Sequence, residues 1–524
     1  MDLASTRASS RRPGLERLAP LYSTFKLHGE SPWSAQRIIQ ETAAGVRVSD
    51  LPGDFTAIAT GTLDGRPQAK IVSSMVAARP YFACQTRDGR FVHGASVFDV
   101  VREAGLPWRW NRRAINCLAL FGHTIGEDTL HPNVRRLPYA ATVTADGTSV
   151  RTVSHDHEWS QLFAPRSPTT MEEAISTLAR VFEESAVTNA VVSLSAGFDS
   201  RLLLALALRR GDRPIALTMG HEASTDVIVA RQIASALGLE HRVVRLEARD
   251  YLTHARAIVA ATSGTKTAAN WHTDLYVRRA GLASNTVHFV GSNGEFARTF
   301  FFDLGGVARA AAKGASVFIE PYVAARLARR AGRFPAPLLA GGPGPRGCAL
   351  DATRASRALT KGFLEALDCF YATERVRHFI GNGLALYAQH CAPRSPFLDA
   401  RWMRAVAALP RRDRLGSNYH RQAVATLWPR LLDFPMGLEP SLAPRAPALY
   451  YARRANVVGY SPFAEVAADP KTRELIVEAS GLDELLSRRD RAAAVERYPA
   501  SVELLLTLAI ASELGREASA RPDA

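Results

Sequence analysis

The spacing of apolar residues gives the chain two different textures. From about residue 50 to 155 the apolar runs are short, such as 71–77 and 140–143, and Asp-Gly pairs stand between runs at Asp64-Gly65, Asp88-Gly89 and Asp146-Gly147. An Asp-Gly pair between apolar runs is a hairpin signal. This half of the sequence therefore predicts an antiparallel sheet with one or two helices.

The hydrophobic period changes after residue 170. Residues 171–185 carry apolar side chains at i, i+3, i+4 and i+7, namely Ile175, Leu178, Ala179 and Phe182, which predicts an amphipathic helix. Beyond it, short apolar runs at 190–194, 214–218, 241–246 and 287–290 alternate with helical segments at 199–210, 225–237 and 251–261. Strands that alternate with helices indicate a parallel sheet with right-handed crossovers.

Further segments predict a helical extension of this sheet. Helical patterns occur at about 308–330, 352–392 and 475–514, while the Pro/Gly-rich segment 334–347 predicts a long surface loop or a lid. The fold class is therefore α/β: an N-terminal α+β region with layered antiparallel sheets, then a parallel-sheet domain with a helical extension. At 524 residues the chain exceeds one core, and we divide it into a flexible tail (1–18), two domains (19–165 and 166–515) and a second tail (516–524).

Composition narrows the functional classes. No apolar run approaches the ~20 residues that span a bilayer, and the first 18 residues lack the apolar core of a secretory signal. The five cysteines form no CxxC pair, so free thiols in a reducing cytoplasm are expected, with no membrane association. The net charge of +15 comes largely from scattered arginine pairs without an aromatic-interleaved basic stripe. This pattern favours a solvated basic surface over nucleic-acid binding.

The chemistry is expected in the loops that follow the parallel strands, at 195–200, 219–226 and 291–298, because ligands bind beyond the carboxyl ends of such strands. The first loop reads Ser195-Ala196-Gly197-Phe198-Asp199-Ser200 and opens a helix. Small residues let backbone N–H groups approach an anion, and a helix N-terminus favours negative charge. Asp199 would repel a bare phosphate, so it indicates a bridging Mg²⁺. The alternative is a helix whose first N–H groups Asp199 and Ser200 merely cap.

This loop resembles the SGGxDS pyrophosphate loop of the asparagine synthetase family and its N-type ATP pyrophosphatase relatives. Ala196 replaces the first glycine, which is tolerable if its φ is negative. Other marks follow in the family's order over roughly 82–434: Leu217-Thr218-Met219-Gly220; Asp226, Ala230, Ile233-Ala234, Leu237-Gly238 and His241; and Ser395-Pro396-Phe397-Leu398-Asp399 with Leu409-Pro410.

The resemblance implies a reaction and its cofactors. It implies ATP-dependent activation of a carboxylate by adenylation, with AMP and pyrophosphate as products, followed by amide-bond formation with ammonia or an amine. The partners would be a small-molecule or peptide carboxylate and an amine donor, and the cofactors ATP and Mg²⁺. It assigns nucleotide binding to Leu194, Ser195, Ala196, Gly197, Asp199, Ser200, Met219, Gly220 and Gly291, and the metal to Asp199 and Glu295.

The catalytic set implied by the resemblance is Glu295, Arg298 and Arg421. Glu295, the one acidic residue of 291–298, would ligate Mg²⁺ or accept a proton from the amine; Arg298 would lower its pKa or contact pyrophosphate. The alternative is a surface Glu–Arg pair. The family's KxxLR lysine has no counterpart in 416–422, where Arg421 or His420 would substitute, unless Lys266 reaches in.

The first domain resembles a degenerate glutaminase-like (Ntn-like) layer. Glutamine-dependent members carry a catalytic cysteine as residue 2, whereas this sequence begins Met1-Asp2-Leu3 and its first cysteine is Cys84. The segments 79–89 and 122–138 resemble later strands of that layer, so we expect no glutamine dependence. A substrate pocket or a helix N-terminus would explain Asn270, Trp271, His272, Asp274 and Tyr276. The alternative functions are an inactive nucleotide-binding scaffold and a tRNA-modifying ATP pyrophosphatase.

Overall fold

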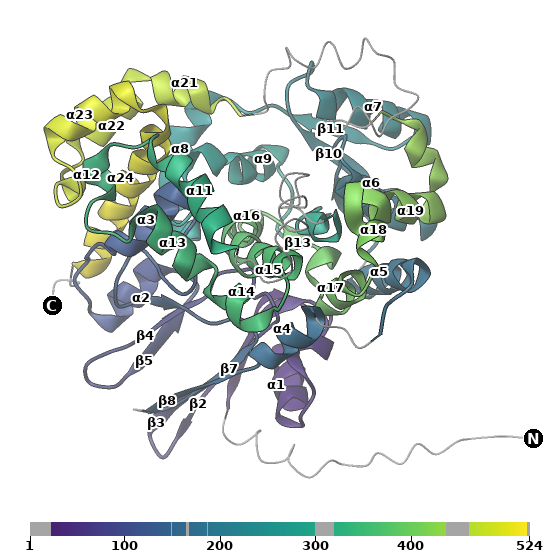
Figure 1. Cartoon of the computed structure of the whole chain (residues 1–524), viewed down its shortest axis with the longest axis horizontal. Helices are drawn as coiled ribbons and strands as arrows, with labels where there is room; N and C mark the ends of the chain where they lie inside the picture. The colour runs from purple at the N-terminus through teal and green to yellow at the C-terminus, as the bar shows by residue number, and fades with distance from the viewer. Residues whose placement is uncertain are drawn as a thin grey trace, which may run out of the picture.

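The computed structural model describes residues 22–147, 149–163, 167–185, 187–298, 319–435 and 461–520. The tail predicted at 1–18 lies outside these ranges. Figure 1 shows antiparallel sheets at one end of the molecule, with the parallel sheet and most helices above them. The predicted fold class, antiparallel layers followed by a parallel sheet with a helical extension, is confirmed.

The N-terminal region contains two antiparallel sheets. The larger has the order β1-β2-β3-β7-β8, from β1 (Thr24–Glu30), β2 (Asp54–Leu63), β3 (Arg66–Ser73), β7 (Ala141–Asp146) and β8 (Ser149–Ser154). The smaller has the order β5-β4-β6, from β4 (Phe82–Gln85), β5 (Phe91–Gly94) and β6 (Arg135–Arg136). Asp64 and Gly65 connect β2 to β3, and both have positive φ, as a type I′ hairpin turn requires.

Alternating side chains of β2 explain the layering of this region. Phe55, Ala57 and Ala59 face a core that includes helix α1, whereas Ile58 packs toward the smaller sheet beside Ala83. Period-2 alternation thus gives one sheet two buried faces. The helices here are α1 (Ala35–Ala43), η2 (Val48–Asp50), α2 (Val97–Ala104), α3 (Arg112–Phe121) and α4 (Asp156–Phe163).

The third sheet is parallel throughout and has the order β11-β10-β9-β12-β13. Its strands are β9 (Val191–Ser193), β10 (Ile215–Met219), β11 (His241–Val244), β12 (Val287–Phe289) and β13 (Ala392–Arg394). Helix α5 (Met171–Ser185) precedes the first strand, and the helices between β9 and β12 are α6 (Phe198–Arg209), α7 (Thr225–Leu237), α8 (Ala248–Thr262), η3 (Ala268–Asn270) and α9 (His272–Ala280).

The sequence predicted the first four parallel strands and missed the fifth. Residue 392 was assigned to the end of a helix, but that helix ends at Tyr387 and residues 392–394 pair with β12. Pro393 cannot donate a backbone hydrogen bond, so this strand is tolerated at the sheet edge and gives a weak sequence signal.

The helical extension follows the third loop. It contains η4 (Gly294–Arg298), α11 (Glu320–Ala331), α12 (Ala336–Leu339), α13 (Gly344–Ala352), α14 (Arg354–Leu359), α15 (Phe363–Phe370), the π-helix η5 (Tyr371–Ile380) and α16 (Gly381–Tyr387). After β13 come η6 (Pro396–Leu398), α17 (Ala400–Ala407), α18 (Arg411–Arg414), η7 (Leu415–Ser417), α19 (Asn418–Leu427) and η8 (Pro429–Asp433). The last helices are α21 (Phe463–Ala468), α22 (Pro470–Glu478), η11 (Ser480–Leu482), α23 (Arg488–Arg497) and α24 (Pro499–Ser519).

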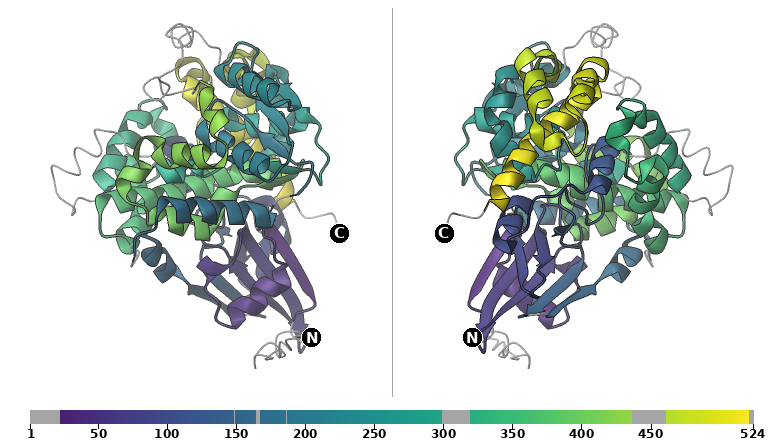
Figure 2. Two further views of the ribbon diagram at one scale, coloured as in Figure 1. Left: turned by 90° about the vertical axis from the view of Figure 1, so that its right-hand side faces the viewer. Right: turned by 90° about the vertical axis from the view of Figure 1, so that its left-hand side faces the viewer.

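Two expectations for loops and tails are wrong. The segment 334–347 is not one long loop, because α12 and the start of α13 lie within it; prolines occupy the first turns of both helices, where no N–H is needed. Residues 516–519 are not a tail but the last turn of α24. The Ser519 hydroxyl accepts a hydrogen bond from Trp108 N at 2.6 Å and anchors this end of the helix. Figure 2 shows these C-terminal helices reaching down beside the N-terminal sheets.

The two predicted domains share their hydrophobic cores. One cluster runs from Tyr22 to Leu431 and another from Phe82 to Ala518, so both cross the boundary predicted at 165/166, which falls outside the described residues. Within the described ranges, no helix combines the length and apolar character that a membrane crossing would need.

Candidate functional site

In the parallel sheet, the chain reverses the direction in which it adds strands at the central strand, β9. The chain passes from β9 to β10 and β11 on one side, and then returns to place β12 and β13 on the other side. The loops that follow β9 and β12 therefore start from two adjacent strands and then separate from each other. Open parallel sheets bind ligands at such a topological switch point.

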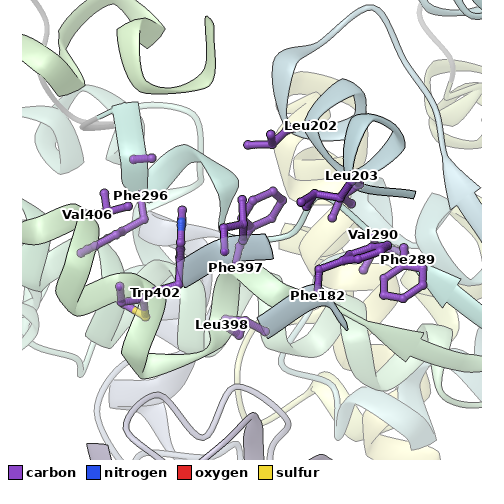
Figure 3. Packing of buried hydrophobic residues seen from close by; sticks show 14 of the residues in the cluster. Phe182, Leu202, Leu203, Phe289, Val290, Phe296, Phe397, Leu398, Trp402 and Val406 are labelled. Carbon is purple, nitrogen blue, oxygen red and sulfur yellow. The ribbon is translucent and has the colours of Figure 1, made fainter. Parts of the chain in front are cut away.

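A buried aromatic cluster fixes this edge of the sheet. Phe289 of β12 lies 4.6 Å from Phe182 of α5, and Phe397 lies 5.1 Å from Trp402 of α17, as measured between ring centroids. Figure 3 shows Phe397 between these two groups, beneath Leu203 of α6. The packing holds β12, α6 and the 395–399 segment in fixed relative positions.

The first loop is tied by its own hydroxyls. Ser195 Oγ accepts a hydrogen bond from Gly197 N at 3.1 Å, and Ser200 Oγ accepts one from Ser195 N at 3.1 Å. Gly197 is the N-cap residue of α6 and makes no side-chain capping bond. No side chain of the described residues caps the N–H groups of the first turn of α6, so the alternative in which Asp199 and Ser200 cap the helix is wrong. Such a terminus favours an anion.

The second loop supports the first. Asp226 Oδ1 accepts a hydrogen bond from Ala196 N at 2.9 Å, and Ala196 has negative φ, the condition under which its methyl group is tolerable. Thr218 Oγ1 donates to Leu194 O at 2.8 Å. At Gly220, where φ is 153°, an added Cβ would lie 2.6 Å from Ser224 Oγ, so only glycine fits after Met219.

The third loop lies against Asp199 because two glycines allow it. A Cβ on Gly291 would lie 3.0 Å from Asp199 Cβ, and a Cβ on Gly294 would lie 2.5 Å from Asp199 Cγ. The loop is anchored from the 395–399 segment: Asn293 Nδ2 donates to Phe397 O at 2.6 Å, and Ser395 Oγ donates to Ser292 O at 2.5 Å. This contact gives the resemblance at 395–399 its structural basis.

The two loops bring two carboxylates into electrostatic contact. Burial raises the pKa of Glu295, the Asp199 charge raises it further, and Arg298 opposes both, so the pKa of Glu295 lies above its usual range. Burial also raises the pKa of Asp199, but the neighbouring His420 and Arg298 outweigh it, and the pKa lies below its usual range. The predicted residues Asp199, Glu295 and Arg298 are thus brought together.

Helix η5 completes the environment of Glu295. The Tyr371 hydroxyl donates to Glu295 Oε2 at 2.8 Å. An ordinary helix was expected here, whereas residues 371–380 form a π-helix, a geometry that often occurs at functional sites. Sequence reasoning missed Tyr371 because an apolar-spaced tyrosine on a helix is indistinguishable from a core residue.

His420, the other residue expected to substitute for the family lysine, lies beside Asp199. His420 Nε2 lies 2.8 Å from Asp199 Oδ1, although the contact is not aligned as a good hydrogen bond, and the imidazole is fully buried. Consecutive residues on a helix point about 100° apart, so Arg421 faces elsewhere. No described contact joins Arg421 to Asp199 or Glu295, and its predicted catalytic role stays a prediction.

Other candidates lie away from the two loops. Lys266 Nζ donates to Phe379 O at 3.2 Å and rests over the Phe379 ring, and none of its described contacts reaches either loop. Of the five residues considered for a substrate pocket, three make core or helix contacts, and the pocket itself stays a prediction. Trp271 is fully buried, Asp274 is paired with Arg278 and His390, and Tyr276 donates to Leu217 O.

The carboxylate pair suits Mg²⁺ held jointly with phosphate. In the described part of the chain, no group of three or more His, Cys, Asp or Glu side chains is arranged to bind a metal unaided. Mg²⁺ is commonly held by one or two carboxylates together with substrate phosphates. Asp199 and Glu295, beside the uncapped start of α6, fit that mode of binding.

Comparison with known proteins agrees with this geometry. Residues 185–294 match the sequence model of the asparagine synthase family, a stretch that contains the first two loops and β12 and ends at Gly294 of the third loop. No curated protein matches the chain. The matched segment is thus asparagine synthetase-like, and it supports ATP-dependent, ligase-type amidation chemistry in general terms.

Proposed function

We propose that the chain binds ATP with Mg²⁺ at the switch point, cleaves it to AMP and pyrophosphate while adenylating a carboxylate, and then joins that carboxylate to ammonia or an amine. One observation carries the proposal: Gly291 and Gly294 bring the Glu295 loop against Asp199, at the uncapped N-terminus of α6. The arrangement offers phosphate donors and metal ligands at one edge of the sheet.

The residues at this edge have distinct roles in the proposal. Ser195, Ser200 and the first N–H groups of α6 bind the leaving phosphates, where a helix terminus favours negative charge. Asp199 and Glu295 would hold Mg²⁺, which when bound neutralises phosphate charge. Arg298, whose charge acts on both carboxylates, stabilises the developing pyrophosphate.

Glu295 and His420 have different roles in the proposal. Glu295 ligates Mg²⁺ or takes part in proton transfer, and His420 positions the Asp199 carboxylate. In the alternative role, in which Asp199 holds Mg²⁺ without Glu295, the raised pKa makes Glu295 a better proton acceptor for an attacking amine than an ordinary glutamate. His420 is a positioning residue: its contact with Asp199 at 2.8 Å keeps that carboxylate ionised and oriented.

The five thiols support ammonia or an amine as the nitrogen source rather than glutamine. All five cysteines are buried. Burial raises the pKa of Cys84 to about 11 and that of Cys369 and Cys391 to about 12, and the pKa of Cys117 is raised by its contact with Cys348 and by burial. A thiol nucleophile needs a lowered pKa and access to solvent. We place the reaction in the cytoplasm, where thiols stay reduced.

The test is product analysis with ATP labelled at the α-phosphate. Purified protein, Mg²⁺ and a panel of amino acids, small acids and peptides are assayed for AMP and pyrophosphate, with ammonia, amines or glutamine as nitrogen donor. AMP formation that requires one carboxylate is expected, and Asp199→Ala should abolish it. Asp212→Ala is the matched control, because Asp212 lies beyond the other end of α6 and pairs with Arg210. ADP as the product, or equal AMP from wild type and Asp199→Ala, would refute the proposal.

A further inference from the structure

A cavity of about 230 Å³ lies where the N-terminal region meets the helical extension. Its walls come from α11, from α15 and η5, and from the end of α3 with the residues that follow it (Figure 1). The volume exceeds the ~150 Å³ that accommodates benzene in an engineered cavity. A single ring or a branched alkyl group with a small head group therefore fits inside.

The walls of this cavity combine two kinds of side chain. One part is apolar, with Leu120 and Phe121 from α3, Leu327 from α11 and Phe370 from α15. The polar part is cationic, with Arg326, Arg330 and Arg375, and none of the described residues that line the cavity carries a carboxylate. His123 also lines it, but burial and the charges of Arg375 and Arg330 lower the pKa of His123 to about 3, so it adds no charge at neutral pH. The walls therefore suit a ligand that combines an apolar body with an anionic head group.

Helix α11 concentrates this positive charge. Arg326, Arg329 and Arg330 of α11, with Arg333 just beyond its end, line an open hollow next to the cavity, and Arg326 and Arg330 belong to both. Like charges at i, i+4 destabilise a helix, so the arrangement costs stability unless something compensates it. Glu503 is a weak compensation, because Arg330 Nη2 lies 3.5 Å from its carboxylate.

Other arginines of the chain are neutralised more fully. Arg279 lies 2.6 and 2.5 Å from Glu247 and Asp250, and Arg401 lies 2.6 and 2.8 Å from Glu184 and Asp399. Arg326, by contrast, makes its described polar contact with the neutral Tyr322 hydroxyl, and no carboxylate of the described residues forms an ion pair with it. Arg326 therefore brings to this cavity a positive charge that no carboxylate of the described residues neutralises through an ion pair.

We propose that this cavity binds a compact amphipathic anion, with an aryl or branched alkyl body against α3 and α15 and a carboxylate or phosphate against Arg326, Arg330 and Arg375. The site is separate from the loops at the switch point and does not depend on the proposed function. It lies close to them, since Phe370 lines the cavity and the next residue, Tyr371, donates to Glu295.

Calorimetric titration of the full chain tests the site without turnover. Phenyl phosphate and phenylacetate carry body and head together, inorganic phosphate carries the head alone, and benzyl alcohol carries the body alone. At least one of the two amphipathic probes should bind about tenfold more tightly than either partial probe, because apolar and charged contacts add when both parts fit. The tighter amphipathic probe identifies the head group as phosphate or carboxylate.

Charge reversal on α11 assigns the binding to the cavity. Arg326→Glu should weaken the tighter probe by at least about tenfold, since one attractive charge becomes repulsive. Arg329→Glu is the matched control on the same helix: Arg329 lines the outer hollow but not the cavity, and it should change affinity less than about twofold. Both residues are exposed, so the fold should be retained, and circular dichroism checks this. Equal weakening by both variants, equal binding of inorganic phosphate, or no binding of either amphipathic probe would overturn the proposal.

Discussion

A buried aspartate and a partly exposed one show how differently the two sheets use their polar groups. Asp54 begins β2 of the antiparallel sheet, and its carboxylate accepts hydrogen bonds from Ser74 Oγ at 2.7 Å and Ala78 N at 3.0 Å. Asp199 stands at the edge of the parallel sheet, where its side chain keeps 19% exposure and its described ion-pair contact is with His420. The first carboxylate is used fully for folding, whereas the second retains acceptor capacity for a ligand.

The same contrast holds for neighbouring charged groups. In the N-terminal region, buried Glu158 accepts from Val48 N and Ser49 N, and buried Arg136 donates to Ala77 O and Ala78 O. At the switch point, both nitrogens of buried His420 lack a well-aligned hydrogen-bond partner among the described residues. Fully satisfied polar groups stabilise a scaffold, and incompletely satisfied ones at a sheet edge indicate a binding site.

The largest expected effect separates the two aspartates directly. Asp199→Ala should reduce AMP formation by roughly 10³-fold, because it removes a metal ligand, and should leave the unfolding free energy within about 1 kcal/mol. Asp54→Ala should instead lower the unfolding free energy by about 2–3 kcal/mol, because it strands the Ser74 and Ala78 donors. Rate assays and urea unfolding measure both quantities, and a reversed pattern would contradict the comparison.

The next largest effect is expected when a methyl group is placed at the close contact between the first and third loops. Gly294→Ala places a methyl group 2.5 Å from Asp199 Cγ, so the loops must separate and activity should fall about 100-fold. Gly332→Ala is the control, because Gly332 has φ −63° and its added Cβ would lie 3.9 Å from the nearest atom. Turnover by the Gly294→Ala enzyme at the wild-type rate would show that the contact is irrelevant.

Glu295→Gln should lower activity about 10- to 100-fold and change its pH dependence. Because the pKa of Glu295 is raised, the ionised form that binds metal or accepts a proton is lost as pH falls while still above 4.5. The wild-type rate should therefore decline on the acid side, and this limb should be absent from the variant. Profiles of kcat/KM from pH 5 to 8 in wild type and Glu295→Gln test this prediction. If both proteins show the same decline on the acid side, that decline belongs to another group.

A smaller loss, about tenfold, is expected for His420→Gln. Without the histidine, the pKa of Asp199 should rise toward its ordinary value and the Mg²⁺ concentration for half-maximal rate should increase. Arg421→Gln on the same helix should change neither quantity. The comparison of the two variants in Mg²⁺ titrations tests the assignment to His420, and a larger loss in Arg421→Gln would favour Arg421 instead.

The smallest effect concerns the contact between β1 of the antiparallel sheet and Ser395, which follows β13 of the parallel sheet. Burial raises the pKa of Glu30 to about 7, although Ser395 N donates to its carboxylate. The folded state therefore holds this proton more tightly than the unfolded state, so the stabilisation is complete below pH 4.5 and is lost as pH rises through 7. Wild type should lose roughly 1–3 kcal/mol across this window, and Glu30→Gln should lose less. Urea unfolding at pH 5 and pH 8 measures the unfolding free energy of both proteins. An equal change in that free energy between the two pH values in wild type and Glu30→Gln would contradict the prediction.

Much of the fold was readable because its signals are local. Asp64-Gly65 predicted its hairpin from turn chemistry, and the strand–helix alternation predicted the order of elements from 190 to 290. Strand β13 escaped prediction because three residues containing Pro393 carry no periodicity. The last turn of α24 also escaped, because the Trp108 contact that anchors it comes from a residue more than 400 positions away.

The site was readable where its chemistry lies in one loop. Asp199 and Glu295 each follow a predicted strand, so their convergence could be inferred from topology. His420 was named as a candidate, but its contact with Asp199 could not be inferred, because a histidine on a helix has no sequence signal for the partner it will meet. Its role depends on α19 packing against α6, a tertiary contact that the apolar pattern does not specify.

The central claim is that the switch point binds ATP with Mg²⁺, and calorimetric titration with α,β-methylene-ATP tests it without a known carboxylate. Wild type and Asp54→Asn should bind the analogue in the presence of Mg²⁺, and removal of Mg²⁺ or Asp199→Ala should weaken binding at least about tenfold. If wild type does not bind the analogue, or if Asp199→Ala binds it equally well with Mg²⁺ present, the assignment of this edge as a nucleotide site is contradicted.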